Sequence, residues 1–126
     1  MVSIIDSNTS ALLSLALDAA GMRQQAIAHN IANANTPGSQ RVSVSFESRL
    51  AALSDSTGKM ATPSLASLGD YRPNFEYAAS TDTGSSIALD QEMAQLSANT
   101  LHHQTLLKAL TKHFSLMSIA INEGKR

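Results

Sequence analysis

The chain has 126 residues, a formal net charge of −1 and no cysteine. This length allows at most one small domain, and the charge argues against a nucleic-acid-binding protein with a broad basic face. Without cysteine there is no disulfide, thiolate metal site or cysteine nucleophile. Aromatic residues make up 4% of the chain while hydrophobic residues together reach 43%, which favours closely packed helices over a core built from large rings.

Residues 1–38 predict a long helix, over about 8–35, followed by a turn. Four possible N-caps lie at positions 6–9. Pro37 disfavours helical geometry at Thr36, and Gly38 permits the chain to reverse, so the helix should end near Asn35. The residues of the expected packing face repeat at steps of four and three, with Leu12, Ala16 and Met22 beside them: Leu13, Leu17, Ala20, Gln24, Ile27, Ile31 and Ala34.

Residues 39–86 predict a flexible middle segment. Val42 and Val44 alternate with serines as in a short strand that reaches Ser45, and two helical turns are expected after it. Residues 54–86 have the Ser-, Thr-, Gly- and Pro-rich composition of a linker. This linker is either a disordered loop or a segment that becomes ordered against neighbouring molecules. In the second case the possible anchors are Phe46, Phe75 and Tyr77.

Residues 87–126 predict a second, longer helix. Asp90 and Glu92 lie near its start and Lys108 and Lys112 toward its C-terminal half, in agreement with the helix dipole, and Gly124 provides a stop. Its spacing over more than four heptads is typical of a helix that packs along a partner helix. The predicted seam, in which two polar positions are candidates for fixing the register, is Leu89, Met93, Leu96, Thr100, His103, Leu107, Leu110, Phe114, Met117 and Ile121.

No pattern in the sequence is typical of catalysis or metal binding. His102 and His103 are adjacent, so a helix directs them about 100° apart, and neither has a histidine four residues away. There is no G-x-S-x-G, phosphate-binding glycine loop or H-E-x-x-H motif. We therefore expect no enzyme, no metal, no cofactor and no small-molecule substrate. A membrane span and a cleaved secretory signal are also not expected.

Together these patterns predict a mainly α protein. The two long terminal helices should pack as a coiled-coil-like hairpin or bundle and form one assembly core, while the pliable middle segment can hold short strands. The second helix is longer than the first, so part of it should extend beyond its partner. An exposed apolar overhang of this kind indicates an assembly surface.

The run from Ala26 to Gly38 reads AIAHNIANANTPG. It resembles the N-terminal signature of bacterial flagellar rod, hook and hook-associated proteins. Phe46-Glu47 and the run LDQEMA from Leu89 are similar to the proximal rod proteins of the FlgB type, and the resemblance covers roughly residues 10–47 and 87–121. Ser39 stands where the family usually has an aromatic residue. The positions that match the family's turn motif are Asn30, Asn33, Asn35, Thr36, Pro37 and Gly38.

This resemblance implies a structural subunit of the proximal rod of the flagellar basal body, which transmits torque and is needed for flagellum assembly and motility. Such proteins leave the cell through the flagellar type III apparatus without cleavage and assemble in the periplasm. The implied partners are further copies, other rod subunits, and basal-body and export-apparatus proteins. Two alternatives remain: a helical adaptor or export-chaperone-like module that binds a partner helix, and a different proximal rod subunit of the same superfamily.

Overall fold

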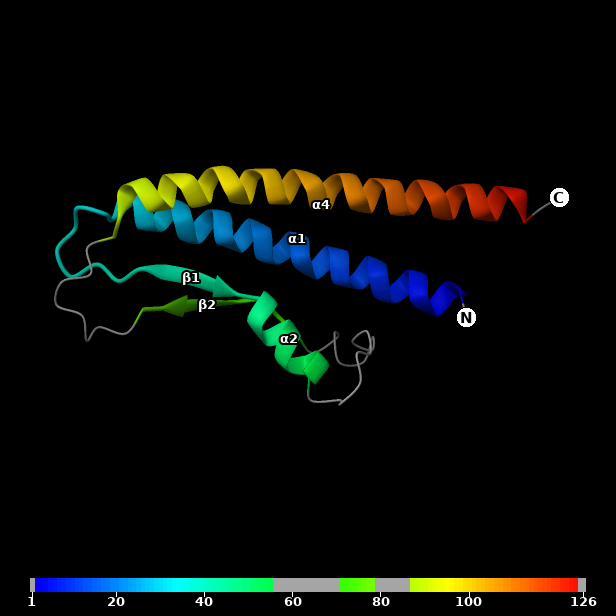
Figure 1. Cartoon of the computed structure of the whole chain (residues 1–126), viewed down its shortest axis with the longest axis horizontal. Coiled ribbons are helices and arrows are strands. Elements are labelled where there is room, and N and C mark those ends of the chain that lie inside the picture. The colour runs from blue at the N-terminus through cyan, green and yellow to red at the C-terminus, as the bar shows by residue number, and fades with distance from the viewer. Residues whose placement is uncertain (1, 56–70, 79–86, 125–126) are drawn as a thin grey trace.

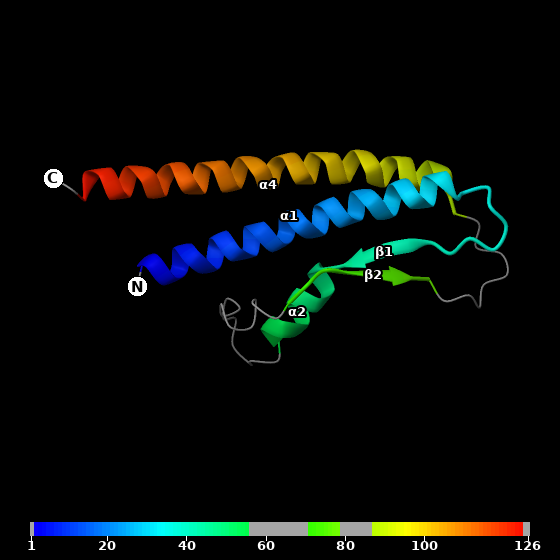
Figure 2. The ribbon, with the colours of Figure 1, turned by 180° about the vertical axis from the view of Figure 1, so that it is seen from behind.

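The computed structural model describes residues 2–55, 71–78 and 87–124 of the chain. Two long helices lie side by side and antiparallel, and the remaining elements lie on the other side of the N-terminal helix (Figures 1 and 2). The predicted mainly α fold, with paired terminal helices and short strands between them, is confirmed. Most of the predicted linker lies outside the described residues. In chain order the elements are α1 (Val2–Ala32), β1 (Val42–Ser45), α2 (Glu47–Asp55), β2 (Asn74–Tyr77) and α4 (Leu89–Glu123).

Helix α1 begins at Val2 and ends at Ala32, so it both starts and ends earlier than the predicted range of 8–35. Its end lies before Asn35 because the residues of the turn motif already form turns after Ala32. The His29 carbonyl accepts the backbone N–H of Asn33 at 3.0 Å, and the Asn33 Nδ2 donates a second hydrogen bond to the same oxygen at 2.9 Å. The Ser39 N–H then donates to the Thr36 carbonyl at 3.2 Å. Pro37 and Gly38, whose φ is +74°, are the central residues of this turn, in the arrangement that favours a type II turn.

The two glycines around α1 should respond in opposite ways to alanine. An added Cβ would meet nothing within 4 Å at Gly21 or at Gly38, so only the backbone conformation decides. Gly21→Ala should raise the free energy of unfolding by about 0.5–1 kcal/mol, since alanine favours the helix. Gly38→Ala should lower it by about 1 kcal/mol because of the positive φ. Urea titration of both variants tests this, and a neutral Gly38→Ala would contradict the assigned turn.

One face of α1 supports the strand layer. β1 and β2 pair antiparallel, with Val42 opposite Tyr77 and Val44 opposite Phe75. Val42 and Val44 are buried with Ala26, and the half-buried Phe75 packs against them. A second cluster lies further toward the N-terminus of α1 and contains Leu15, Ala19, Phe46 and Tyr71. Hydrophobic burial along this face therefore fixes the hairpin and the start of α2 on α1.

Tyr71 packs in the second cluster through its ring and forms a hydrogen bond through its hydroxyl. Its ring lies 5.7 Å from the Phe46 ring between centroids, in a tilted arrangement. Its hydroxyl donates to the Ser45 carbonyl at 3.2 Å, and burial raises the pKa of that hydroxyl. Tyr71 thus fills apolar space while giving the end of β1 a hydrogen-bond donor.

Helix α4 covers a different face of α1. The two helices are closest near the end of α1 and the start of α4, and they draw apart toward the other end (Figures 1 and 2). Asn99 is the last residue of α4 that is buried. The second half of α4 is therefore held less tightly by the chain's own contacts.

Candidate assembly surface and helix junction

Three segments meet where α4 begins, and a buried asparagine on α1 contacts the other two. Asn30 is completely buried. Its Oδ1 accepts a hydrogen bond from the Val42 N–H at 2.8 Å, and its Nδ2 donates to the Val42 carbonyl at 2.8 Å. The same Nδ2 donates to Oε2 of Glu92 at 3.1 Å. One side chain therefore satisfies the backbone of β1 and also binds the first turn of α4.

Glu92 is the charged member of this site, and its side chain is 1% exposed. Its Oε1 accepts a hydrogen bond from Arg41 Nε at 2.6 Å, and another guanidinium nitrogen of Arg41 donates to Gln95 Oε1 at 2.8 Å. A buried carboxylate is tolerated only when it is paired and hydrogen-bonded. Both Glu92 oxygens have donors, so the charge is compensated. We call Asn30, Arg41 and Glu92 the junction cluster.

Asn99 makes the next polar contact along the helix pair. Its Nδ2 donates to the Ala20 carbonyl at 3.0 Å and to Gln24 Oε1 at 2.8 Å. Ala20 and Gln24 belong to the packing face predicted for the first helix. Of the other predicted positions on this face, Ile27 is buried and the rest are half-buried: Leu13, Leu17, Ile31 and Ala34.

The positions of α4 that are at least half-buried repeat along the helix at steps of four and three. Four residues of the seam predicted for this helix are among these covered positions: Leu96, His103, Leu110 and Met117. Several of the other covered positions are polar. The covered positions of α4 are Glu92, Leu96, Asn99, His103, Leu106, Leu110, His113 and Met117.

The remaining apolar positions of the predicted seam are exposed in this chain. Phe114 has an exposed fraction of 50%. Four of these residues, together with the exposed Thr100, are spaced by seven residues along the helix, so they form a continuous row beside the covered positions. We call this row the α4 stripe. Its apolar members are Leu89, Met93, Leu107, Phe114 and Ile121.

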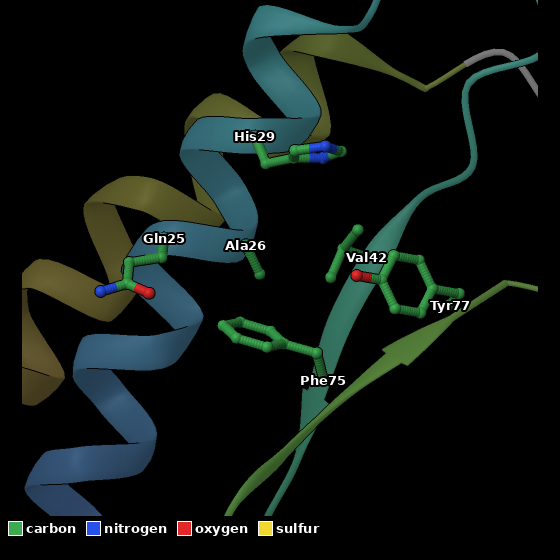
Figure 3. Close-up of a pocket in the computed structure, with 6 residues that line it drawn as sticks. All are labelled: Gln25, Ala26, His29, Val42, Phe75 and Tyr77. Carbon is green, nitrogen blue, oxygen red and sulfur yellow. The ribbon is translucent and has the colours of Figure 1, made fainter.

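The three possible anchors of the middle segment have different environments. Phe46 is buried and Phe75 is half-buried, both in contacts within the chain. Tyr77 is 66% exposed. Phe75 and Tyr77 line a surface pocket of about 210 Å³ with Gln25, Ala26, His29 and Val42 (Figure 3). This volume is below the range usual for small-molecule sites.

An ion pair connects α2 to α1. The Arg23 guanidinium contacts both carboxylate oxygens of Glu47, at 2.9 and 2.7 Å. Burial raises the pKa of Glu47, but its backbone hydrogen bond and the hydrogen bond and charge of Arg23 hold that pKa below its ordinary value. The Glu47 side chain is largely exposed, so we expect this pair to contribute little to stability.

The described residues include no group of three or more His, Cys, Asp or Glu side chains placed to hold a metal ion. Within the same residues, no helix is long and apolar enough to cross a membrane. The arrangement offers two features that can act in recognition: the polar junction cluster and the exposed α4 stripe.

The sequence indicates Asn30 only as part of a family motif and gives no role to Arg41. It indicates Glu92 as a helix-dipole charge, and no sequence pattern indicates Asn99. Hydrophobic periodicity predicts burial from apolar residues, so it does not predict that a polar residue in a heptad position is buried when neighbouring positions are apolar. The available signal was spacing, because Glu92 and Asn99 are in phase with Leu96, His103 and Leu110.

Comparison with known proteins gives two matches. Residues 13–40 match the family described as "Flagella basal body rod protein". The chain is 30% identical over 125 residues to the flagellar basal body rod protein FlgB of Bacillus subtilis (strain 168), an alignment that covers 94% of this chain and 97% of the relative. The turn motif, the paired terminal helices and this nearly full-length similarity lead to one conclusion: the chain belongs to the flagellar basal body rod protein family.

Proposed function

We propose that this protein is a structural, non-catalytic subunit of the proximal rod of the bacterial flagellar basal body. The observation that carries the proposal is the α4 stripe, an apolar row that runs along a paired terminal helix and whose members are 44–61% exposed in the described part of the chain. Family membership supports the same function. The rod links the flagellum to its motor, so the subunit would transmit torque and be needed for flagellum assembly and motility.

The α4 stripe suits contact with other subunits. Its apolar members lie beside the positions that already face α1, so a further helix could pack there and extend the existing interface. An apolar surface that remains exposed in one chain is typical of a protein–protein contact. A helical assembly requires two different complementary surfaces on each subunit. The stripe would be one of them, and its partners would be further copies of the chain, other rod subunits, or basal-body and export-apparatus proteins.

The proposed location is the periplasmic part of the basal body, reached by flagellar type III export without cleavage. A rod protein of this kind must pass a narrow channel before it assembles. The described fold is compatible with this route, because no residue in the second half of α4 is buried. Such a helix costs little to separate and can exchange its contacts during assembly.

Deleting the gene tests the function. Cells without it should be non-motile and should lack completed rods in electron micrographs of basal bodies. Expression of the wild-type chain from a plasmid should restore both. Normal swimming of the deletion strain would contradict the proposal, provided that no second rod protein of this type is encoded.

Alanine at the two aromatic residues of β2 should weaken incorporation into the rod, but less than a charge in the α4 stripe. Tyr77→Ala should leave the melting temperature unchanged, because Tyr77 is mostly exposed. Phe75→Ala removes a ring that packs on Ala26 and Val42, so it should also lower stability by about 1–3 kcal/mol. Thermal melts and the amount of each variant in purified basal bodies test this. Complete loss of incorporation for Tyr77→Ala would show that β2 is a principal contact.

A further inference from the structure

The junction cluster joins segments that are distant in the sequence. Asn30 and Glu92 are 62 residues apart, and Arg41 and Glu92 are 51 residues apart. The Glu92 carboxylate uses one oxygen for Asn30 on α1 and the other for Arg41, next to β1. A single buried carboxylate thus holds the start of α4 to both of the other segments.

The contacts depend on one another. If α4 separates, Asn30 and Arg41 lose their charged acceptor. If β1 separates, Arg41 is carried away, and Glu92 keeps only the donor on Asn30. A buried charge with incomplete pairing is strongly unfavourable, so each docked segment stabilises the docking of the other. In contrast, no residue of α4 after Asn99 is buried, and none of them belongs to the junction cluster.

We propose that the junction cluster is a latch that couples the docking of β1 on α1 to the docking of the first turns of α4. The two segments then form a single cooperative unit that closes and opens together. The second half of α4 lies outside this unit and can change its contacts while the latch stays closed. This inference does not depend on the function proposed above.

Hydrogen exchange on the full chain, followed by mass spectrometry, tests the latch. In the wild-type protein, peptides that cover residues 40–46 and 89–97 should exchange through a shared opening event, with the same dependence on low concentrations of urea. Peptides from residues 107–121 should exchange faster. This measurement requires no substitution, so it remains informative even if the variants described next fail to fold.

Glu92→Gln provides the matched perturbation. Glutamine offers only one acceptor oxygen, so its amide group must face the donor of Asn30 or of Arg41. Exchange should accelerate about tenfold or more in both peptides. Asp90→Asn removes the same charge from an exposed position in the same helical turn, and it should leave β1 unchanged.

Three results would overturn the proposal. The first is different urea dependence of the two peptides in the wild-type chain. The second is faster exchange in α4 of Glu92→Gln with β1 unaffected, which would mean that the contacts stabilise each segment independently. The third is a lack of protection in both peptides of the wild-type chain, which would show that the latch does not close.

Discussion

Phe114→Asp should abolish rod assembly and swimming while the variant chain is still made and exported. Phe114 lies in the α4 stripe and is half exposed in the single chain, so the substitution should leave the isolated fold intact. In an assembly the same position would be covered by a neighbour, and an unpaired buried carboxylate there costs about 3 kcal/mol or more per contact. Circular dichroism of the purified chain, its level in the exported fraction and soft-agar swimming are the three measurements.

Two further variants distinguish an effect of the α4 stripe from a general effect of an added charge on α4. Ser115→Asp places the same charge on the adjacent exposed position, outside the α4 stripe, and should swim normally. Leu110→Asp alters a half-buried position that is in phase with Asn99, which contacts α1. It should therefore abolish motility and also weaken the pairing of α1 with α4. Normal motility of Phe114→Asp would exclude the stripe as an assembly surface. A loss of helicity in Phe114→Asp would show that Phe114 serves the fold of the single chain instead.

Asn30→Ala should lower the free energy of unfolding by about 3–5 kcal/mol. The substitution removes two hydrogen bonds to the backbone of Val42 and one to Glu92, and the groups that lose their partner are buried. Each buried polar group left without a partner costs about 1–3 kcal/mol, and a charged group costs more. The total is a large fraction of the stability of a small domain. Urea unfolding followed by circular dichroism measures it.

Asn35→Ala is the control for this experiment, because Asn35 belongs to the same motif but is exposed. Its stability should stay within about 0.5 kcal/mol of the wild type. If Asn30→Ala were as mild as Asn35→Ala, the buried hydrogen bonds of Asn30 would not be important for stability. Equal and large losses in both variants would indicate instead that the motif acts mainly through the conformation of the turn.

The paired-helix fold could be predicted because apolar spacing over long helices is a strong local signal. On α1, two positions of the predicted packing face, Ala20 and Gln24, contact Asn99 of α4. In α4 the apolar residues fit two adjacent rows along the helix. The predicted seam follows the row with more apolar residues, which includes Met93 and Phe114. The row that is covered in the structure contains the polar residues Glu92, Asn99 and His113.

The strand layer was only partly predictable. Val42 and Val44 gave the local signal for β1, and two helical turns after it were also expected. Their partners are not local: Phe75 lies opposite Val44, and Tyr71 packs on Phe46. No sequence period specifies such pairings, since they depend on which surfaces α1 brings together. The junction cluster was missed for the same reason, because Asn30, Arg41 and Glu92 belong to separate segments.

Incorporation of this protein into the flagellar rod can be measured directly. Intact basal bodies should be purified from the source organism and their proteins identified by mass spectrometry, beside particles from which the rod has been stripped. A rod subunit should give peptides in the rod-containing particles and none in the stripped ones. Detection of the chain in the soluble fraction alone would contradict the proposed function and favour a helical adaptor.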